Sequence, residues 1–349
     1  MEFSPVLAAL ALVLAMVTEI PAQDWKALLR LAMTVDEMAP WRWLTDAQVF
    51  AVHPAAVAEP VFCSVMGQGD SLKGLALYPG REGWQTYVRI GQSSADEDPL
   101  EALCLDRCAL LQLVPVGEAS QDDLALLRAV GVEPGAVVPS FNCYSPGYAP
   151  QAPDAAEMAW LLPVLREVVH FLGDLPGSGE VVPETGQNDL GRILARKQVG
   201  DAFVLDWILP GSAQNFSPET VKLSEEEARV LRDLPVAQEV WLFEDVHLPE
   251  PQEDGSGRAF FPRAVILLGL EDQQFRGASL LRPQDFPGAL GQVLMRQMLQ
   301  VRAVPANLVV ARPANMILLR PFCQALGIGI HLETEMDIRP SLREALMES

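Results

Sequence analysis

Four polar residues near the C-terminus alternate with apolar ones, namely His331, Glu333, Glu335 and Asp337. In a strand, every second side chain lies on the same face, and imidazole and carboxylate groups together can bind a divalent metal ion. Alternate positions lie about 7 Å apart, because each residue advances a strand by about 3.3 Å, so one ion cannot contact all four groups. The spacing therefore favours the solvated face of an edge strand over a metal site.

The last third of the chain is rich in arginine. Between Arg258 and Arg320 there are eight arginines against three acids, although the whole chain has a net charge of -21. One hypothesis is an anion-binding or nucleic-acid-binding surface. The alternative, favoured because few aromatic residues are available for base stacking, is that these arginines pair with the acidic first domain or are scattered. The candidates for an anion site are Arg276, Arg282, Arg296 and Arg312.

Composition narrows the class of protein. The 46 acidic and 25 basic residues disfavour general binding to nucleic acid or anionic membranes, because like charges repel. The five cysteines are an odd number spread over 349 residues, which is typical of reduced thiols in the cytoplasm. Cys104 and Cys108 are four residues apart, but no second pair or nearby histidine completes a zinc set. We expect no cofactor.

The apolar segment Pro5–Val17 stands apart from the rest, and we treat residues 1–22 separately. It resembles the core of a signal peptide, but Glu2 replaces the usual basic start and no clean cleavage motif follows. It is also too short to span a bilayer. A buried helix or a misassigned start codon is favoured, and the predicted location is the cytoplasm without a membrane partner.

Periodicity and turn residues predict a mixed α/β (α+β) protein of two domains. We place an α+β domain at residues 23–175, a linker at 176–189 and a mixed α/β domain at 190–349, because the Gly- and Pro-rich stretch Gly173–Asp189 resembles a linker. Three predictions are tested below: Pro139–Pro153 as irregular structure, Leu190–Lys197 as a helix, and Glu244–Gly257 as an acidic loop. From about Phe260 the expected order is β-β-α-β-α-β-α, ending with a helix at Pro340–Met347.

Several motifs resemble an uncharacterised bacterial family in which a domain with a PGY-type motif precedes a second domain of unknown function. The similar stretches are Ala39–Val52, Cys63–Gly67, Leu75–Gly83, the SPGYAP turn Ser145–Pro150, Val304–Pro313 and Leu318–Ile330. The resemblance implies a two-domain bacterial protein and no particular activity. We expect the Tyr148 ring of the SPGYAP turn to pack against the first domain and anchor this loop.

The order of elements in the second domain is also similar to part of the ribonuclease H-like fold, so this domain is predicted as a degenerate form of it. Nucleases of that fold hold two metal ions with carboxylates on the first strand and its neighbours. Here the expected first strand, Arg263–Leu270, is followed by Glu271 and Asp272 in a turn that would ordinarily carry acids. The strand Leu308–Ala311 continues into Arg312, where the nuclease pattern would require an acid.

The sequence therefore predicts a non-enzymatic cytoplasmic binding or regulatory protein. We assign no catalytic, cofactor-binding or metal-binding residue, and a protein is the expected class of partner. The alternative is a metal-dependent nuclease or nucleic-acid-processing protein that uses Glu271 and Asp272.

Overall fold

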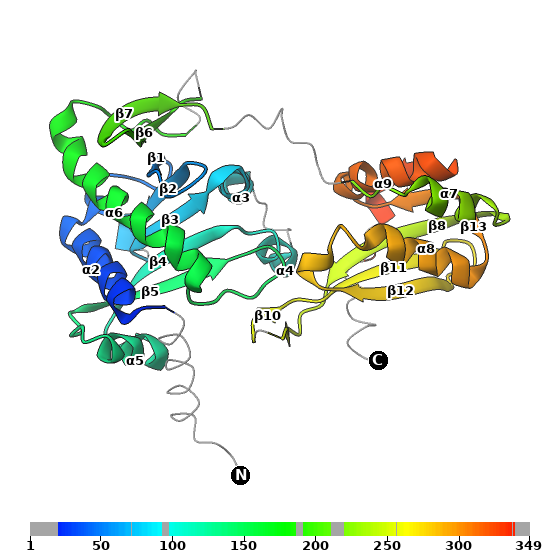
Figure 1. The fold of residues 1–349 in the computed structure, drawn as a ribbon, viewed down its shortest axis with the longest axis horizontal. Coiled ribbons are helices and arrows are strands. Elements are labelled where there is room, and N and C mark those ends of the chain that lie inside the picture. Colours follow the sequence, from blue (N-terminus) through cyan, green and yellow to red (C-terminus); the bar gives the residue numbers. More distant parts are fainter. Residues whose placement is uncertain are drawn as a thin grey trace, which may run out of the picture. The chain divides into compact units, whose positions relative to one another are not determined.

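The computed structural model describes residues 20–70, 72–92, 98–185, 191–210, 220–255, 257–336 and 338. These residues form two compact units (Figure 1). Residues 98–105 and 146–149 belong to the C-terminal unit together with those from 220 onward, and the other described residues form the N-terminal unit. The expected segments Pro5–Val17 and Pro340–Met347 lie outside the described residues.

The N-terminal unit is built on a seven-stranded sheet with the order β5-β4-β3-β2-β1-β6-β7. All neighbours are antiparallel except β1 and β6, which are parallel. The strands are β1 Phe50–His53, β2 Val61–Met66, β3 Gly74–Pro79, β4 Cys108–Pro115, β5 Val137–Tyr144, β6 Ile193–Val199 and β7 Ala202–Ile208.

Helices cover both faces of this sheet. They are α2 Ala22–Met38, α3 Gly80–Gln92, α5 Gln121–Ala129 and α6 Ala155–Ser178, with short 3-10 helices η1 Pro40–Arg42 and η2 Gln68–Asp70. Apolar residues of α2, α5 and α6 form the main core on one face, where the rings of Phe50 and Phe171 stack 4.2 Å apart. On the other face α3 packs Trp84 and Tyr87 against the sheet. A capping box between Asp154 and Glu157 fixes the start of α6.

The structure changes the expected division of the chain. Ile193–Val199 is strand β6, not a helix, because its backbone pairs with both β1 and β7. Helix α6 continues to Ser178, and after it Val182 is buried in the N-terminal core, with its carbonyl accepting a hydrogen bond from Gln48 (2.7 Å). Of the predicted linker at 176–189, the described residues 176–185 therefore begin in a helix and include the buried Val182, and the two strands after the linker belong to the first sheet.

The C-terminal unit contains a five-stranded sheet with the order β12-β11-β8-β13-β14. Strand β8 pairs antiparallel with β11, which pairs antiparallel with β12, whereas β13 runs parallel to β8 and β14 parallel to β13. Helices α7, α8 and α9 cover one face of the sheet (Figure 1). The helices are α4 Pro99–Leu103, α7 Glu225–Arg232, α8 Leu290–Val301 and α9 Pro313–Leu326, with η4 Pro283–Asp285 and η5 Thr334–Met336; the strands are β8 Val236–His247, β9 Gln252–Glu253, β10 Ala259–Phe260, β11 Arg263–Gly269, β12 Phe275–Leu281, β13 Val304–Val310 and β14 Gly329–Leu332.

Three sequence predictions were wrong in detail. Strand β8 runs to His247, so residues 244–247 of the predicted acidic loop belong to a strand. Strand β14 is an edge strand, as expected, but it ends at Leu332, so the alternation from His331 to Asp337 does not form one strand face. The predicted irregular stretch contains the end of β5, whose residues pair with β4 along its whole length.

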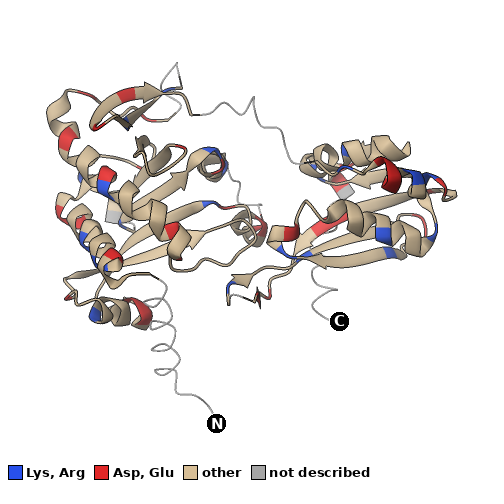
Figure 2. Ribbon diagram, in the orientation of Figure 1, with Lys and Arg blue, Asp and Glu red and all other residues tan. Residues whose placement is uncertain are grey.

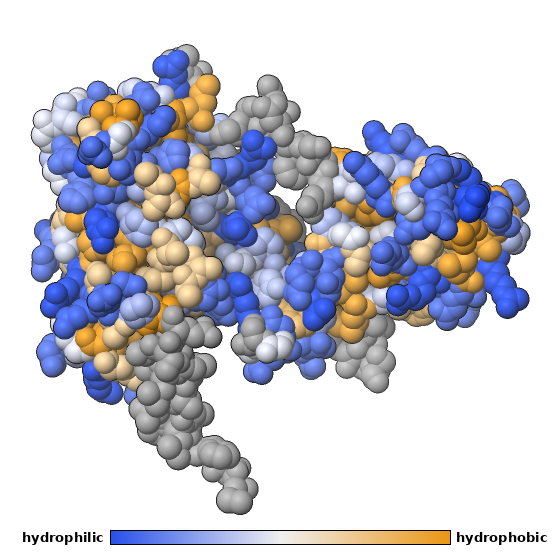
Figure 3. Space-filling model, viewed as in Figure 1, coloured by the Kyte–Doolittle hydropathy of each residue, from blue (hydrophilic) through white to orange (hydrophobic). Residues whose placement is uncertain are grey.

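Both signs of charge occur on the ribbons of each unit (Figure 2). Hydrophobic and hydrophilic residues are interspersed on the face of the molecule seen in Figure 3. In the described part of the chain, none of the helices combines the length and the apolar character needed to cross a membrane.

Candidate functional site

Charged residues gather at the carboxyl ends of β8 and β13 in the C-terminal unit. In open α/β sheets, ligands usually bind outside the carboxyl ends of parallel strands, where the strand order reverses. The parallel register aligns Val310 with Phe243, so the chain reaches Asp245 and Arg312 two residues further along the two strands. Helix α9 starts immediately afterwards and places Asn315 in its first turn.

Asp245 is the centre of this cluster and its side chain is 1% exposed. Its carboxylate contacts the guanidinium groups of Arg263 and Arg312 and accepts a hydrogen bond from the Asn315 amide (2.7 Å). The main-chain carbonyl of Asp245 accepts a further hydrogen bond from Arg312 (2.7 Å). Burial alone would raise the pKa of Asp245, but the two arginines and the amide lower that pKa well below its ordinary value.

Helix α4 adds a second carboxylate from a distant part of the sequence. The Asp98 side chain caps this helix by accepting a hydrogen bond from the Leu100 amide (2.9 Å). Glu101 then accepts hydrogen bonds from the main-chain amide of His247 (2.8 Å) and contacts its ring Nδ1 (3.0 Å). Burial opposes ionisation of Glu101, but the contacts with His247 and the charge of Arg312 lower its pKa.

Glu244 is the third buried carboxylate, and Arg312 connects it to the other two. Arg312 Nη2 lies 3.2 Å from the carboxylate of Glu244, and its Nη1 lies 4.0 Å from that of Glu101. Three carboxylates therefore face two guanidinium groups and one imidazole. This cluster, defined by Glu101, Glu244, Asp245, His247, Arg263, Arg312 and Asn315, is called the buried charge cluster below.

The PGY loop, residues Pro146–Ala149, packs in the same unit beside α4. The Gly147 amide donates to the Cys104 carbonyl (2.8 Å), and the Gly147 carbonyl accepts from the Phe261 amide (2.8 Å). Gly147 has a φ of 77°, and a Cβ there would lie 2.7 Å from the Pro283 side chain, so glycine is required.

Tyr148 shows that one sequence expectation was wrong. Its ring stacks under the guanidinium of Arg258 at 4.2 Å, and its hydroxyl donates to Gln284 (2.7 Å). These partners belong to the C-terminal unit, whereas the sequence analysis placed the ring against the first domain. The loop reaches these partners because Ala149 pairs with Ala259 through a backbone hydrogen bond of 3.0 Å.

The structure does not bring the sequence-derived candidates together. Glu271 and Asp272 lie exposed in the turn between β11 and β12, where the Asp272 carboxylate pairs with Arg276 (2.7 Å). Arg276 also contacts Glu239, Arg282 pairs with Asp285 (3.0 Å), and Arg296 lies exposed on α8. Of the four candidate arginines only Arg312 is part of the buried charge cluster. Arg276, Arg282 and Arg312 thus pair with acids of their own unit.

Glu101, Asp245 and Arg263 were not predicted from the sequence as site residues. The acidic residues after Phe243 were read as the start of a solvated loop, although two apolar residues, Val246 and Leu248, alternate with the polar ones beyond them. That alternation is the signal that β8 continues. Nothing near Glu101 indicates its distant partner His247.

The thiols and acids offer no further site of this kind. None of the five cysteines forms a disulfide bond, and burial raises the pKa of Cys108 and of Cys323 to about 12, which disfavours the nucleophilic thiolate. In the parts of the chain that the structure describes, no group of three or more His, Cys, Asp or Glu residues is arranged to hold a metal ion.

Comparison with known proteins divides the chain in two. Residues 25–193 match the model of a domain of unknown function (DUF7309), and residues 227–347 match that of another (DUF6930). No curated protein matches the chain. Both α4 and the PGY loop lie within the first match, although they pack in the C-terminal unit. The chain therefore joins two distinct domains of unknown function, DUF7309 followed by DUF6930, in the two-domain arrangement that its sequence motifs suggested.

Proposed function

We propose that this chain is a non-enzymatic binding or regulatory protein, in which the buried charge cluster has a structural role. The contact of Arg263 and Arg312 with the Asp245 carboxylate carries the proposal. A divalent cation binds hard oxygen ligands, and here those oxygens already contact two fixed positive charges. A cation placed beside two guanidinium groups would also be repelled by them.

The order of the sheet supports the same proposal. If the ribonuclease H-like comparison starts at β8, then Asp245 lies on the first strand, where nucleases of that fold have a carboxylate. Arg312 follows β13, where the nuclease pattern would require an acid. An arginine in place of that acid would convert a metal site into an ion-pair cluster. The domain would then be a degenerate member of that fold.

The proposed structural role is to hold α4. Glu101 and His247 form two hydrogen bonds in a buried setting, where a carboxylate without partners would be costly. Glu101 lies in the segment matched by the first domain model, and His247 and Arg312 lie in the segment matched by the second. The cluster would thereby fix part of the first domain's sequence on the second domain.

A titration with Mg²⁺ or Mn²⁺ tests the proposal. We expect no calorimetric signal of metal binding at millimolar metal, and no cleavage of single-stranded or duplex DNA or RNA above that of the Glu271→Ala, Asp272→Ala double variant. Metal-dependent cleavage that persists in that double variant but is lost in Asp245→Asn would overturn the structural role. Cleavage lost in the double variant would instead assign activity to the turn.

The cellular setting belongs to the same proposal. Buried reduced thiols, as found for Cys63, Cys143 and Cys323, support a cytoplasmic location. We propose a protein as the partner, since the net charge of -21 opposes association with nucleic acid.

A further inference from the structure

A basic pocket lies in the N-terminal unit, whereas the buried charge cluster belongs to the C-terminal unit. Its volume is about 520 Å³, and it is lined by Trp41, Arg42, Gly67, Gln68, Gly69 and Lys73. Helix η1 contributes the tryptophan and Arg42, and the turn between β2 and β3 contributes the other four. Pockets of a few hundred Å³ are typical of small-molecule sites.

Glycines shape the wall of this basic pocket. Gly67 has a φ of 123°, and a Cβ there would lie 3.0 Å from Lys73 Cγ and 3.3 Å from Trp41 Cβ. Gly69 has a φ of 70°, and a Cβ there would meet no heavy atom within 4 Å. The absence of a side chain at Gly67 thus lets the turn lie against Trp41, while Gly69 borders open space.

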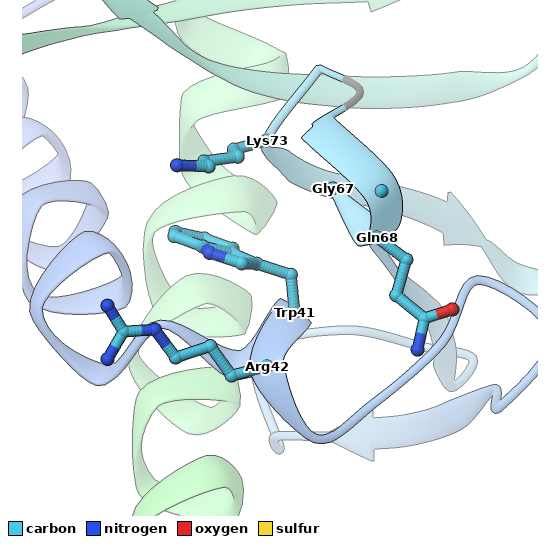
Figure 4. Close-up of a pocket in the computed structure, with 6 residues that line it drawn as sticks. Trp41, Arg42, Gly67, Gln68 and Lys73 are labelled. Atoms are coloured by element: carbon cyan, nitrogen blue, oxygen red, sulfur yellow. The ribbon is translucent and has the colours of Figure 1, made fainter.

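Two cationic side chains flank the tryptophan. The Lys73 ammonium group lies 5.7 Å from the centroid of the Trp41 ring, and the ring lies between Lys73 and Arg42 (Figure 4). Both cationic side chains are exposed, whereas Trp41 is 7% exposed. Among the described residues, neither cation forms an ion pair with a carboxylate. Within the described part of the chain, both cations are therefore available to a negatively charged ligand.

We propose that this pocket binds a small organic anion through a phosphate or carboxylate group. Lys73 and Arg42 would supply charge-assisted hydrogen bonds to the oxyanion. The Trp41 ring, which lines the pocket, would offer apolar surface to the organic part of the ligand. A polyanion is excluded from this proposal, because the remaining charge of the chain would repel its extended backbone.

Matched aromatic probes test this site in the full-length chain. Phenyl phosphate and benzoate share a ring and differ in the oxyanion, and benzamide is the neutral analogue of benzoate. We expect one or both anions, but not benzamide, to shift the ¹⁵N-indole NMR signal of Trp41, which is assigned by its loss in Trp41→Phe. Binding of one anion alone would identify the oxyanion as phosphate or carboxylate.

The variants separate the site from general charge. Combined Arg42→Gln and Lys73→Gln should weaken binding about 10-fold or more, because two charge-assisted hydrogen bonds are lost. Lys222→Gln, an exposed lysine in the C-terminal unit, is the matched control and should leave affinity unchanged. The proposal is overturned if neither anion shifts the Trp41 signal, if benzamide binds as well, or if the double variant retains wild-type affinity. None of these results bears on the proposed function, because the metal titration tests the C-terminal unit and this pocket lies in the N-terminal unit.

Discussion

Replacement of Arg312 by methionine is the most direct test of the buried charge cluster. Methionine keeps an unbranched apolar stem but removes the guanidinium group that contacts Asp245 and Glu244. The Asp245 side chain is 1% exposed and that of Glu244 is 0% exposed, so water cannot replace the lost partner without opening the structure.

The expected loss of stability depends on the partners that Asp245 retains after Arg312 is replaced. Removing one partner of a buried ion pair typically costs about 3–5 kcal/mol, because the other charge stays buried without compensation. Asp245 keeps Arg263 and Asn315, which argues for the lower end of this range. We therefore expect Arg312→Met to lower the free energy of unfolding of the C-terminal unit by about 3 kcal/mol.

Urea unfolding measures this loss, with hydrogen exchange used to assign each transition to one of the two units. Arg282→Met is the matched control, because Arg282 forms an exposed ion pair with Asp285, and such pairs contribute about 0–1 kcal/mol. Adding Glu244→Gln to Arg312→Met should recover part of the loss, since the double variant no longer buries the Glu244 carboxylate charge that Arg312 had faced. The reasoning is refuted if Arg312→Met costs no more than Arg282→Met.

Two further predictions concern Glu101 and the composition of the C-terminal unit. The pKa values of Glu101 and Asp245 are lowered in the folded state, so both carboxylates stabilise the fold above their unfolded pKa of about 4, and this contribution is lost as pH falls through the folded values. In acid titrations followed by circular dichroism, Glu101→Gln should be less stable than wild type at pH 7 and should lose stability less steeply below pH 4; an equally steep loss would contradict the assignment. Separately, a fragment of residues 220–349 lacks α4 and the PGY loop, so it should unfold at lower urea than the C-terminal unit of the full chain, and equal midpoints would show that residues 98–105 and 146–149 are dispensable.

Local sequence patterns were sufficient for elements whose determining contacts lie close together in the chain. Ser224 followed by three glutamates is typical of a helix start, and the structure has α7 there with a capping box; Gly327 is typical of a helix end, and α9 ends at it. Two apolar runs that flank a short polar turn are likewise typical of a hairpin, and they form β11 and β12. In each case the determining contacts lie within a few residues of one another.

Local pattern failed where a distant strand supplies the partner. Leu190–Lys197 was predicted to be a helix, but pairing with β1 and β7 makes Ile193–Val199 a strand. The acidic residues at 244 and 245 resembled a solvated loop, because two adjacent carboxylates inside a core are costly unless they are paired. Their partners are Arg263 from β11 and Arg312, which directly precedes α9, and no local pattern indicates them.

The same distinction between local and distant contacts applies to the candidate sites. From its sequence alone, the chain could be placed as an acidic two-domain α/β protein, and the arginine after the fourth strand of the C-terminal sheet already argued against a metal site. Only the tertiary structure joined Glu101 to His247 and Trp41 to Lys73, since each pair lies far apart or on separate segments of the chain. Burial decides the energetics of such contacts, and burial is a property of the folded chain rather than of any local stretch of sequence.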